Sequence, residues 1–297
     1  MPCHTLILPR EKTSLRSSSV NFPDSPGPIG VFDSGYGGLT ILHQLRQILP
    51  QYDFMYLGDN ARAPYGSRSF EVVYKFTREA VQKLFSMGCH LVILACNTAS
   101  AKALRTIQQH DIPQWDASRR VLGIIRPTAE CIGSITRSRH VGILATEGTI
   151  NSESYDLEIQ KQFPDIKVSG VACPLWAAIV EANEADSPGA DYFVNKRITQ
   201  LMLKDPEIDT IILGCTHYPL LFNSILKYAP RGVKIVPQGE YVANSLKQYL
   251  KNHSEMEEMI TKTGTVRYLT TENPDKFKEL AQVFLHEQVE VESVSFD

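Results

Sequence analysis

The segments LVILACNT (91–98) and TIILGCTH (210–217) decide the fold, because each runs a short apolar stretch into one cysteine followed by small polar residues. Short, fully apolar stretches rich in β-branched side chains are typical of strands that are buried on both faces of a parallel sheet. The two cysteines therefore end two similar strands in distant parts of the chain. Such a pair suggests a site that needs one thiol on each side of the molecule that it binds.

The likeness between the two halves extends upstream of the cysteines. IGVFDSGYGGL (29–39) and VGILATEGTI (141–150) both pass from a β-branched apolar run into a Gly-rich turn that carries hydroxyl groups. The turn precedes its cysteine by 63 positions from Asp33 to Cys96 and by 69 positions from Thr146 to Cys215. An internal duplication and a chance likeness both account for this order, and the repeat is far longer than that of a solenoid.

Apolar strands alternate with helical stretches along most of the chain. Segments 69–87, 191–203 and 240–250 have the three-to-four-residue apolar spacing of helices that pack on one face. The expected strands are 29–32, 54–57, 91–95, 121–125, 141–144, 168–172, 210–213 and 234–236. This alternation predicts an α/β fold in which mainly parallel sheets are covered by helices on both faces.

In open α/β sheets, ligand sites collect at the carboxyl ends of the strands, where loops meet helix N-termini. Asp33, Cys96, Thr146 and Cys215 all fall at expected strand ends. A thiol at a helix N-terminus lies near unpaired N–H groups and the positive end of the helix dipole, and both favour the thiolate. One cysteine in this position is usually structural, whereas two in the same motif favour catalysis.

Each cysteine has a neighbour that can handle a proton. Asp33 in the first Gly-rich turn and His217, two residues after Cys215, can hold or relay a proton near sulfur. Taken alone, Asp33 is also explained as a turn residue and His217 as a satisfied core or surface histidine. Helix caps and hydrogen-bonding groups around a carboxylate or ammonium come from Asn97, Thr98 and Thr216.

Composition and charge exclude several classes of function. The chain has 297 residues, of which 43% are hydrophobic, and its net charge of -3 gives no electrostatic footprint for nucleic acid. No apolar run approaches the ~20 residues of a membrane span, and we expect a soluble cytoplasmic protein. The GYGG turn matches neither GxGxxG nor a Walker loop, so nucleotide binding is not expected.

The six cysteines contain no C-x-x-C pair and fit reduced thiols better than a disulfide framework or a metal site. Those outside the two motifs are best explained as small buried side chains or bystanders: Cys3, Cys89, Cys131 and Cys173. Residues 1–28 are rich in Ser and Pro, and we expect a flexible extension there.

With these residues in place, the chain resembles the cofactor-independent aspartate/glutamate racemase family, and within it the glutamate racemases most closely. The resemblance covers nearly everything from about Ile29 to the last helix. It rests on FDSGYGGL (32–39), GDNARAPYG (58–66), ACNTASA (95–101), ILATEGTI (143–150) and GCTHYPLL (214–221).

The resemblance implies a mechanism, because family members use two cysteines as acid and base on opposite faces of the substrate Cα. Cys96 would take the proton from D-glutamate and Cys215 from L-glutamate. Asp33 would assist the first thiol, and His217, backed by Glu181 of CPLWAAIVEAN (173–183), would assist the second. The substrate contacts carried over by the same motifs are Asp33, Ser34, Tyr65, Gly66, Asn97, Thr98, Thr149, Thr216 and His217.

The resemblance also implies two doubly wound domains that face each other across the site, the first formed by residues 29–121 and 236–297 and the second by 122–235. It implies no cofactor, no metal, a homodimer, and a role in supplying D-glutamate for peptidoglycan, with activation by a peptidoglycan precursor in some members that carry an N-terminal extension. Two alternatives stay open: an aspartate or hydantoin racemase with the same thiols, and a binding role such as inhibition of DNA gyrase.

Overall fold

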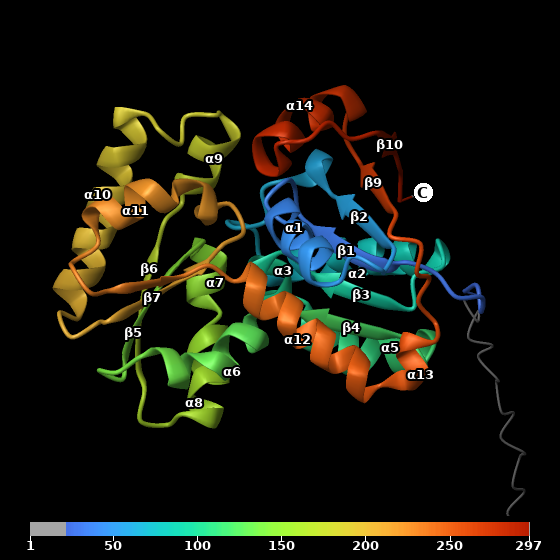
Figure 1. Ribbon diagram of the computed structural model, residues 1–297, viewed down its shortest axis with the longest axis horizontal. Coiled ribbons are helices and arrows are strands. Elements are labelled where there is room, and N and C mark those ends of the chain that lie inside the picture. The colour runs from blue at the N-terminus through green and yellow to red at the C-terminus, as the bar shows by residue number, and fades with distance from the viewer. Residues whose placement is uncertain (1–21, 297) are drawn as a thin grey trace, which may run out of the picture.

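The computed structural model describes residues 22–296 and consists of two α/β domains that lie side by side, each built on one sheet (Figure 1). The first sheet has the order β10-β9-β2-β1-β3-β4, and the second has the order β6-β5-β7-β8. Every strand pair is parallel. The strands of the first sheet are β1 (Ile29–Asp33), β2 (Phe54–Gly58), β3 (Leu91–Leu94), β4 (Arg120–Gly123), β9 (Val266–Thr270) and β10 (Val291–Ser293). Those of the second are β5 (His140–Ala145), β6 (Lys167–Ala172), β7 (Thr210–Gly214) and β8 (Lys234–Val236).

The two sheets repeat one topology. Strands β2-β1-β3-β4 of the first domain and β6-β5-β7-β8 of the second have the same order and the same direction. Cys96 and Cys215 follow the equivalent strands β3 and β7, and the Gly-rich turns follow the equivalent strands β1 and β5. The expected α/β fold with two mainly parallel sheets is therefore confirmed, and the shared topology supports an internal duplication.

All eight expected strands are present, and the helices expected at 69–87, 191–203 and 240–250 are also present with slightly shifted ends. The helices are α1 (Leu39–Ile48), α2 (Phe70–Ser86), α3 (Asn97–Lys102), α4 (Leu104–Thr106), α5 (Ile112–Trp115), α6 (Ile125–Ile135), α7 (Glu147–Asn151), α8 (Ser154–Gln162), α9 (Trp176–Glu181), α10 (Pro188–Lys204), α11 (Phe222–Tyr228), α12 (Gly239–Asn252), α13 (Ser254–Glu257) and α14 (Pro274–Leu285). Short 3₁₀ turns span Asn60–Arg62 and Tyr218–Leu221, and a π turn spans Ile107–Asp111. The two strands that sequence patterning missed, β9 and β10, lie at one edge of the first sheet, and β10 is short and largely exposed.

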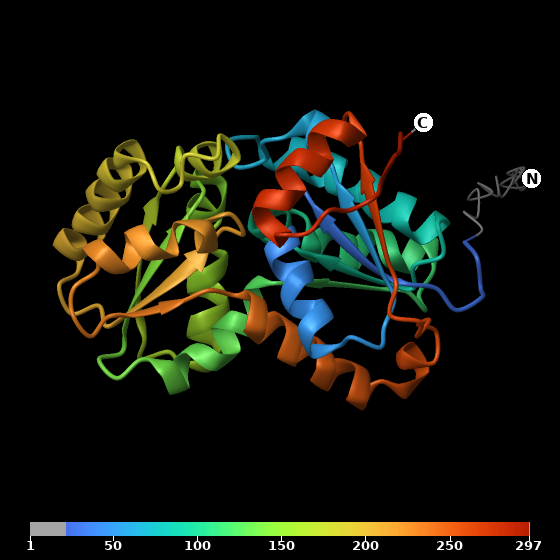
Figure 2. The same cartoon turned by 45° about the horizontal axis from the view of Figure 1, so that its top comes forward.

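Helices cover both faces of each sheet because the strand side chains alternate between the faces. In the first domain, Ile29 and Val31 belong to the core under α1, α12 and α14, whereas Phe32 belongs to the core under α2 and α3. In the second domain, Ile211 and Leu213 lie under α9, α10 and α11, and Ile212 lies under α6 and α8. Figure 2 shows these layers from a second direction.

The chain crosses twice between the two sheets. It leaves the first sheet after β4 and enters α6, and it returns after β8 into α12, which packs along α1 of the first domain. The core under α1 and α12 continues into the second domain through buried residues such as Ile124 and Tyr218. The loops that follow the carboxyl ends of the two sheets meet at the junction between the domains.

Residues 22–28 pack against the first domain. Phe22 is buried with its ring 5.5 Å from that of Phe85, and the Arg119 guanidinium donates to the Pro23 carbonyl. The Gly27 amide donates to the Met259 carbonyl at 3.1 Å. Burial of a phenylalanine contributes roughly 1.5–3 kcal/mol, so this part of the expected flexible extension is held in place. The remainder of that extension, residues 1–21, lies outside the described residues.

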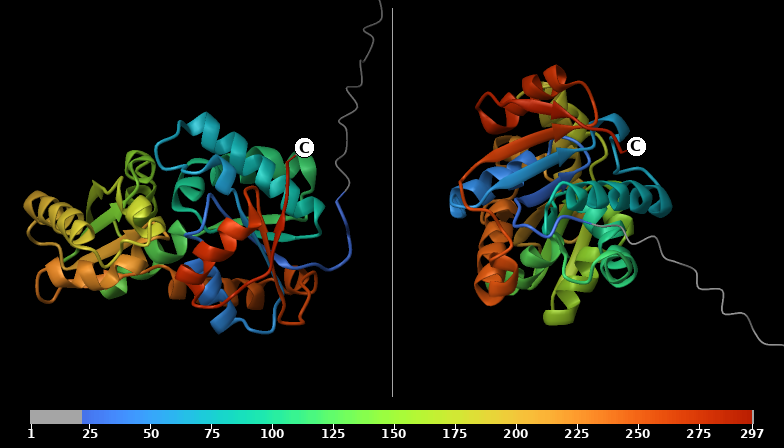
Figure 3. Two further views of the ribbon diagram at one scale, coloured as in Figure 1. Left: turned by 90° about the horizontal axis from the view of Figure 1, so that it is seen from above. Right: turned by 90° about the vertical axis from the view of Figure 1, so that its right-hand side faces the viewer.

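The described chain begins on the side of the first domain that faces away from the second domain (Figure 3). None of the helices within residues 22–296 is long and apolar enough to cross a membrane.

Candidate active site

The two cysteine-bearing loops meet where the domains touch. Thr40 of α1 donates its hydroxyl to the Thr216 carbonyl at 2.9 Å, and Gly148 of α7 donates its amide to the Gly66 carbonyl at 2.8 Å. Each of these bonds joins a residue of one domain to a residue of the other. The thiols of Cys96 and Cys215 are both buried, with 6% of each residue exposed.

Cys96 is the N-cap residue of α3, as expected from its place at a strand end. Its Sγ accepts a hydrogen bond from the Ala99 amide at 3.5 Å and lies 3.4 Å from the Ser34 hydroxyl. Burial and the nearby charge of Asp33 raise the pKa of the Cys96 thiol to about 12, although the bonds from Ser34 and Ala99 oppose that rise. The free site therefore holds Cys96 as a neutral thiol at pH 7, ready to donate a proton.

Asp33 ends β1 and is almost fully buried at 1% exposure. Its Oδ1 accepts the Gly35 amide at 2.8 Å, which fixes the carboxylate against the Gly-rich turn. Burial raises the pKa of Asp33, while the positive charge of His217 acts in the opposite direction. Ser34, rather than Asp33, makes the direct contact with Cys96, so Asp33 acts on that sulfur through its charge.

Cys215, His217 and Glu181 form a linear relay in the second domain. The Cys215 Sγ lies 3.8 Å from Nδ1 of His217, and Nε2 of the same ring lies 2.7 Å from Glu181 Oε1. Burial alone would favour the neutral ring, yet the bonds with Cys215 and Glu181 raise the pKa of His217 to about 10. The ring is therefore an imidazolium at neutral pH, and it can donate a proton to sulfur or stabilise a thiolate.

Three threonine hydroxyls cluster across the domain junction beside the thiols. Thr98 Oγ1 lies 3.0 Å from Thr146 Oγ1 and 3.4 Å from Thr149 Oγ1, and the two latter hydroxyls lie 3.0 Å apart. Thr146 also caps α7 by accepting the Thr149 amide. These hydroxyls can rotate to serve as donors or acceptors, so the cluster is suited to a carboxylate or an ammonium.

The PYG segment contributes backbone rather than a free phenol. Tyr65 is 1% exposed, and its hydroxyl donates to Asp59, whose carboxylate also binds Arg62. The Tyr65 ring thus packs inside the first domain. Gly66 reaches the cleft, because its carbonyl accepts the amide of Gly148 from the second domain.

Asn97 and Thr216, expected to bind substrate, are also at the junction. Asn97 is 3% exposed and bonds through its side chain to Gln238 and Tyr155. Thr216 is 4% exposed and lies beside Gly37, where an added Cβ would come closer than 3.0 Å to its hydroxyl. The junction therefore brings together residues of the motifs around both cysteines, whereas the Tyr65 side chain packs within the first domain.

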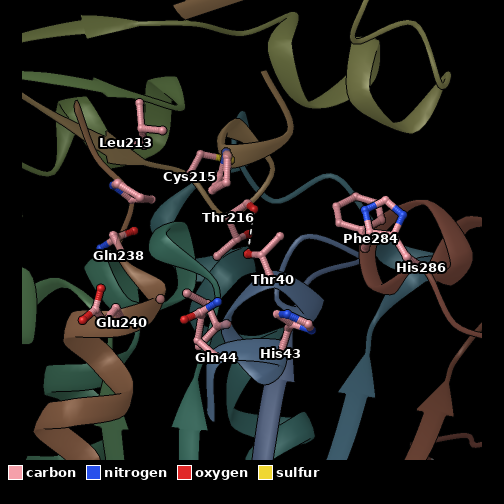
Figure 4. Close-up of a pocket in the computed structure, with 14 residues that line it drawn as sticks. Thr40, His43, Gln44, Leu213, Cys215, Thr216, Gln238, Glu240, Phe284 and His286 are labelled. Carbon is pink, nitrogen blue, oxygen red and sulfur yellow. Dashed lines mark hydrogen bonds between the residues drawn. The ribbon is translucent and has the colours of Figure 1, made fainter. Parts of the chain in front are cut away.

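A cavity of about 430 Å³ opens beside Cys215 on the α1 and α12 side of the junction (Figure 4). Thr40, Thr216 and Gln238 line it together with Phe284 of α14, whose ring meets the His217 ring edge-to-face at 5.6 Å. Cys96 and Asp33 do not line this cavity. The cavity therefore adjoins only the Cys215 side of the site.

The described side chains offer no metal centre: within residues 22–296, no group of three or more His, Cys, Asp or Glu residues could hold a metal ion. The chemistry that the residues themselves support is proton transfer at two places. One place has a neutral thiol with a hydroxyl and a backbone amide, and the other has a thiol with an imidazolium.

Sequence patterning missed several residues that complete the site. Gln238 lies two residues after the end of strand β8, so the strand-end rule points at it, although nothing in VPQGE marks it as functional. Tyr155 and Phe284 lie within ordinary helical sequence, and only their tertiary contacts reveal them.

Comparison with known proteins identifies the family. Residues 39–245 match the model of the Asp/Glu/Hydantoin racemase family. The glutamate racemase of Ruegeria sp. (strain TM1040) is 37% identical over 276 residues, which cover 89% of this chain and 99% of that protein.

Solved structures agree with this assignment. The glutamate racemase isoform RacE1 of Bacillus anthracis superposes with a TM-score of 0.81 at 34% identity, over 91% of this chain and 97% of that one. The glutamate racemase of Francisella tularensis, solved with D-glutamate, also gives 0.81 at 33% identity, over 92% of this chain and 98% of that one. The chain therefore belongs to the Asp/Glu/hydantoin racemase family, and within that family to the glutamate racemases.

Proposed function

We propose that this protein interconverts L-glutamate and D-glutamate by moving a proton between the substrate Cα and two thiols, without a cofactor. The observation that carries the proposal is the placement of Cys96 and Cys215 after equivalent strands of two sheets whose carboxyl ends face each other. Racemisation needs proton handlers on opposite faces of one carbon, and two facing copies of one strand-end site supply them.

The protonated Cys96 thiol of the free site suits the L-to-D direction. Cys96 is held as a neutral thiol by its raised pKa, and the His217 imidazolium lies beside Cys215. In the proposed L-to-D reaction, the Cys215 thiolate removes the Cα proton while His217 stabilises the sulfur. The Cys96 thiol then donates its proton to the opposite face of Cα, which inverts the configuration.

The reverse reaction uses the same groups with their roles exchanged. The Cys96 thiolate removes the proton from D-glutamate, and the Ser34 hydroxyl and the Ala99 amide stabilise the sulfur by hydrogen bonding. Cys215 then donates its proton to the opposite face of Cα. The His217–Glu181 pair lies beside this sulfur and can return a proton to it. A buried cleft strengthens these interactions because it excludes water.

The substrate is proposed to bind to side-chain hydroxyls that lie near the two thiols. Thr98 of α3, Thr149 of α7 and Thr216 after β7 offer hydroxyls from three different segments, and Ser34 offers a fourth. Such a set can bind two carboxylates and one ammonium, which is the polar pattern of glutamate.

Deuterium exchange tests the proposal directly. Purified protein is incubated with L-glutamate in D₂O without added cofactor, while optical rotation and Cα deuterium are followed. Loss of rotation together with deuterium at Cα supports racemisation through proton transfer at that carbon. Absence of both with glutamate, and their presence with aspartate or a hydantoin, would instead favour the alternative substrates.

The two-thiol mechanism predicts the behaviour of two single variants. Cys96→Ser and Cys215→Ser should each abolish racemisation and leave the circular dichroism spectrum unchanged, because a serine hydroxyl is far less acidic than a thiol. Cys131→Ser is the matched control, since Cys131 is partly exposed on α6 and has no place in the site. Substantial turnover by either active-site variant would contradict the two-thiol mechanism.

The cellular role is proposed on the same basis. We propose that the protein is cytoplasmic, supplies D-glutamate for peptidoglycan and forms a homodimer. Depletion of the protein should stop growth unless D-glutamate is supplied, and light scattering should give twice the mass of one chain. Activation by a peptidoglycan precursor stays a prediction, which a rate measurement with and without that precursor tests.

A further inference from the structure

A closed ring of three side-chain hydrogen bonds lies at the domain junction, beside the proposed active site. Asn97 donates from Nδ2 to Gln238 Oε1 at 2.7 Å. Gln238 donates from Nε2 to the Tyr155 hydroxyl at 2.7 Å, and that hydroxyl donates to Asn97 Oδ1 at 2.7 Å. Each side chain is donor to one neighbour and acceptor from the other, so all three bonds run in the same sense around the ring.

The ring fixes the orientation of both amides. Asn97 is 3% exposed, and Tyr155 and Gln238 are each 2% exposed, so water cannot replace a lost partner. Rotation of either amide by half a turn would set oxygen against oxygen or N–H against N–H, which costs a buried hydrogen bond. In a medium of low dielectric, bonds linked in this way strengthen one another. Asn97 is therefore held in one orientation beside Cys96.

Two members of the ring adjoin the two thiols. Asn97 is the first residue of α3 and follows Cys96 directly. Tyr155 belongs to α8, and its ring packs against Gly214, where an added Cβ would come within 3.1 Å of it. Gly214 precedes Cys215, so the hydrogen-bonded ring of Asn97, Tyr155 and Gln238 lies between the strand ends that carry the two cysteines.

The third member, Gln238, contacts both crossings between the domains. It lies in the return crossing, between β8 and α12, and its Nε2 also donates to the Ile124 carbonyl at 3.1 Å in the outward crossing, between β4 and α6. The Thr128 hydroxyl of α6 lies 3.3 Å from the same nitrogen but outside the ring. Gln238 also lines the cavity beside Cys215 (Figure 4).

We propose that Gln238 is a positioning residue of the racemase reaction, which, through its ring with Asn97 and Tyr155, sets the placement of Cys96 relative to Cys215. The proposal rests on the proposed function, because only a reaction that uses both thiols depends on their mutual placement. Proton transfer at one carbon from two opposite sides is sensitive to such placement, and a displacement of about 1 Å can cost about 100-fold in rate.

The test uses variants that open the ring while conserving volume. Gln238→Leu and Tyr155→Phe each remove bonds of the ring, and we expect each to lower kcat by about 10- to 100-fold with a smaller change in KM. The double variant should be no slower than the slower single variant, because the ring is already open. In D₂O, recovered L-glutamate should also gain more deuterium per inversion, because a carbanion that the displaced Cys96 does not protonate lasts long enough for the Cys215 thiol to exchange its proton with solvent and return a deuteron.

Thr128→Val is the matched control, because it removes a buried hydroxyl at the same junction but leaves the ring closed. It should lower the melting temperature to a similar extent and leave kcat within about twofold. A kcat that follows melting temperature across all variants, or losses that multiply in the double variant, would overturn the positioning role. An inactive wild type would overturn the proposed function itself, whereas an active wild type with a fully active Gln238→Leu would overturn this inference alone.

Discussion

Replacement of Glu181 by glutamine should lower the pKa of His217, so that the ring loses its proton at a lower pH than in the wild type. The rise of that pKa from its ordinary 6.5 to about 10 corresponds to roughly 5 kcal/mol in favour of the imidazolium. This preference is supplied by Cys215 and Glu181 together, against the opposing effect of burial. Glu181→Gln keeps the volume and the acceptor oxygen near Nε2 but removes the negative charge.

The expected size of the effect follows from the exposure of the pair. The Glu181 side chain is 35% exposed and the His217 side chain 9%, so solvent screens the ion pair in part. A charged hydrogen bond is about twice as strong as a neutral one, and we expect the pKa of His217 to fall in the variant from about 10 toward its ordinary 6.5. Because the folded-state pKa is raised, the stabilisation is complete below about pH 6.5 and is lost as pH rises through about 10 in the wild type. In the variant, the loss should occur at lower pH.

Histidine NMR provides the assay. The His217 ring signals, assigned by comparison with His217→Asn, are followed from pH 6 to 11 in wild type, Glu181→Gln and Glu184→Gln. Glu184 is the matched control, since it is exposed, lies three residues further along and makes no bond to the ring. An unchanged His217 midpoint in Glu181→Gln, or an equal fall in Glu184→Gln, would refute the claim that the ion pair holds the proton.

Two further predictions concern packing and acid stability. Gly37→Ala should lower kcat by about 100-fold, because its Cβ would come closer than 3.0 Å to Thr216 Oγ1 and His217 Nδ1. Gly189→Ala is the control, because its Cβ would meet only Ser187 Oγ at 3.5 Å, and its kcat should stay within about twofold of the wild-type value. Steady-state kinetics of both variants decide the matter, and a fully active Gly37→Ala would contradict it. Asp53→Asn should reduce the free energy of unfolding at pH 7 by about 1–3 kcal/mol, since Asp53 Oδ1 accepts the amides and hydroxyls of Thr263 and Thr265. Burial opposes ionisation, yet these bonds hold the pKa of Asp53 below its ordinary value, so its contribution is present above about pH 4 and fades as pH falls. Urea unfolding at pH 7 and pH 3 should therefore show a gap between wild type and variant that narrows in acid, and an equal gap at both pH values would be evidence against the assignment.

The fold was predictable because its strands are buried on both faces and therefore read as short apolar runs. Strands β9 and β10 gave no such signal: β10 is three residues long and largely exposed, and the first two residues of β9, Val266 and Arg267, are not buried. β10 is the edge strand, and an edge strand can be short and polar because only one of its sides is paired. Their place in the first sheet depends on contacts with β2 and α14, which local sequence does not encode.

The site was predictable to the extent that it sits at strand ends. Cys96, Cys215 and Asp33 each follow an apolar run, and His217 lies two residues beyond Cys215. Glu181 joins the relay from a separate helix, and the resemblance to a family rather than any local pattern pointed to it. The ring of Asn97, Tyr155 and Gln238 is assembled from three segments far apart in the chain, so its members look ordinary one at a time.

The two halves of the molecule share a topology but differ in how they treat their thiols. Cys96 has a hydroxyl and a backbone amide as neighbours, whereas Cys215 has an imidazolium held by a carboxylate. The two enantiomers of an amino acid have equal free energies in solution, so kcat/KM for the proposed racemisation must be the same in both directions. The difference between the thiols can therefore appear only in the separate values of kcat and KM. Duplication accounts for the facing positions of the two sulfurs, and divergence of their neighbours accounts for the different groups that each sulfur contacts.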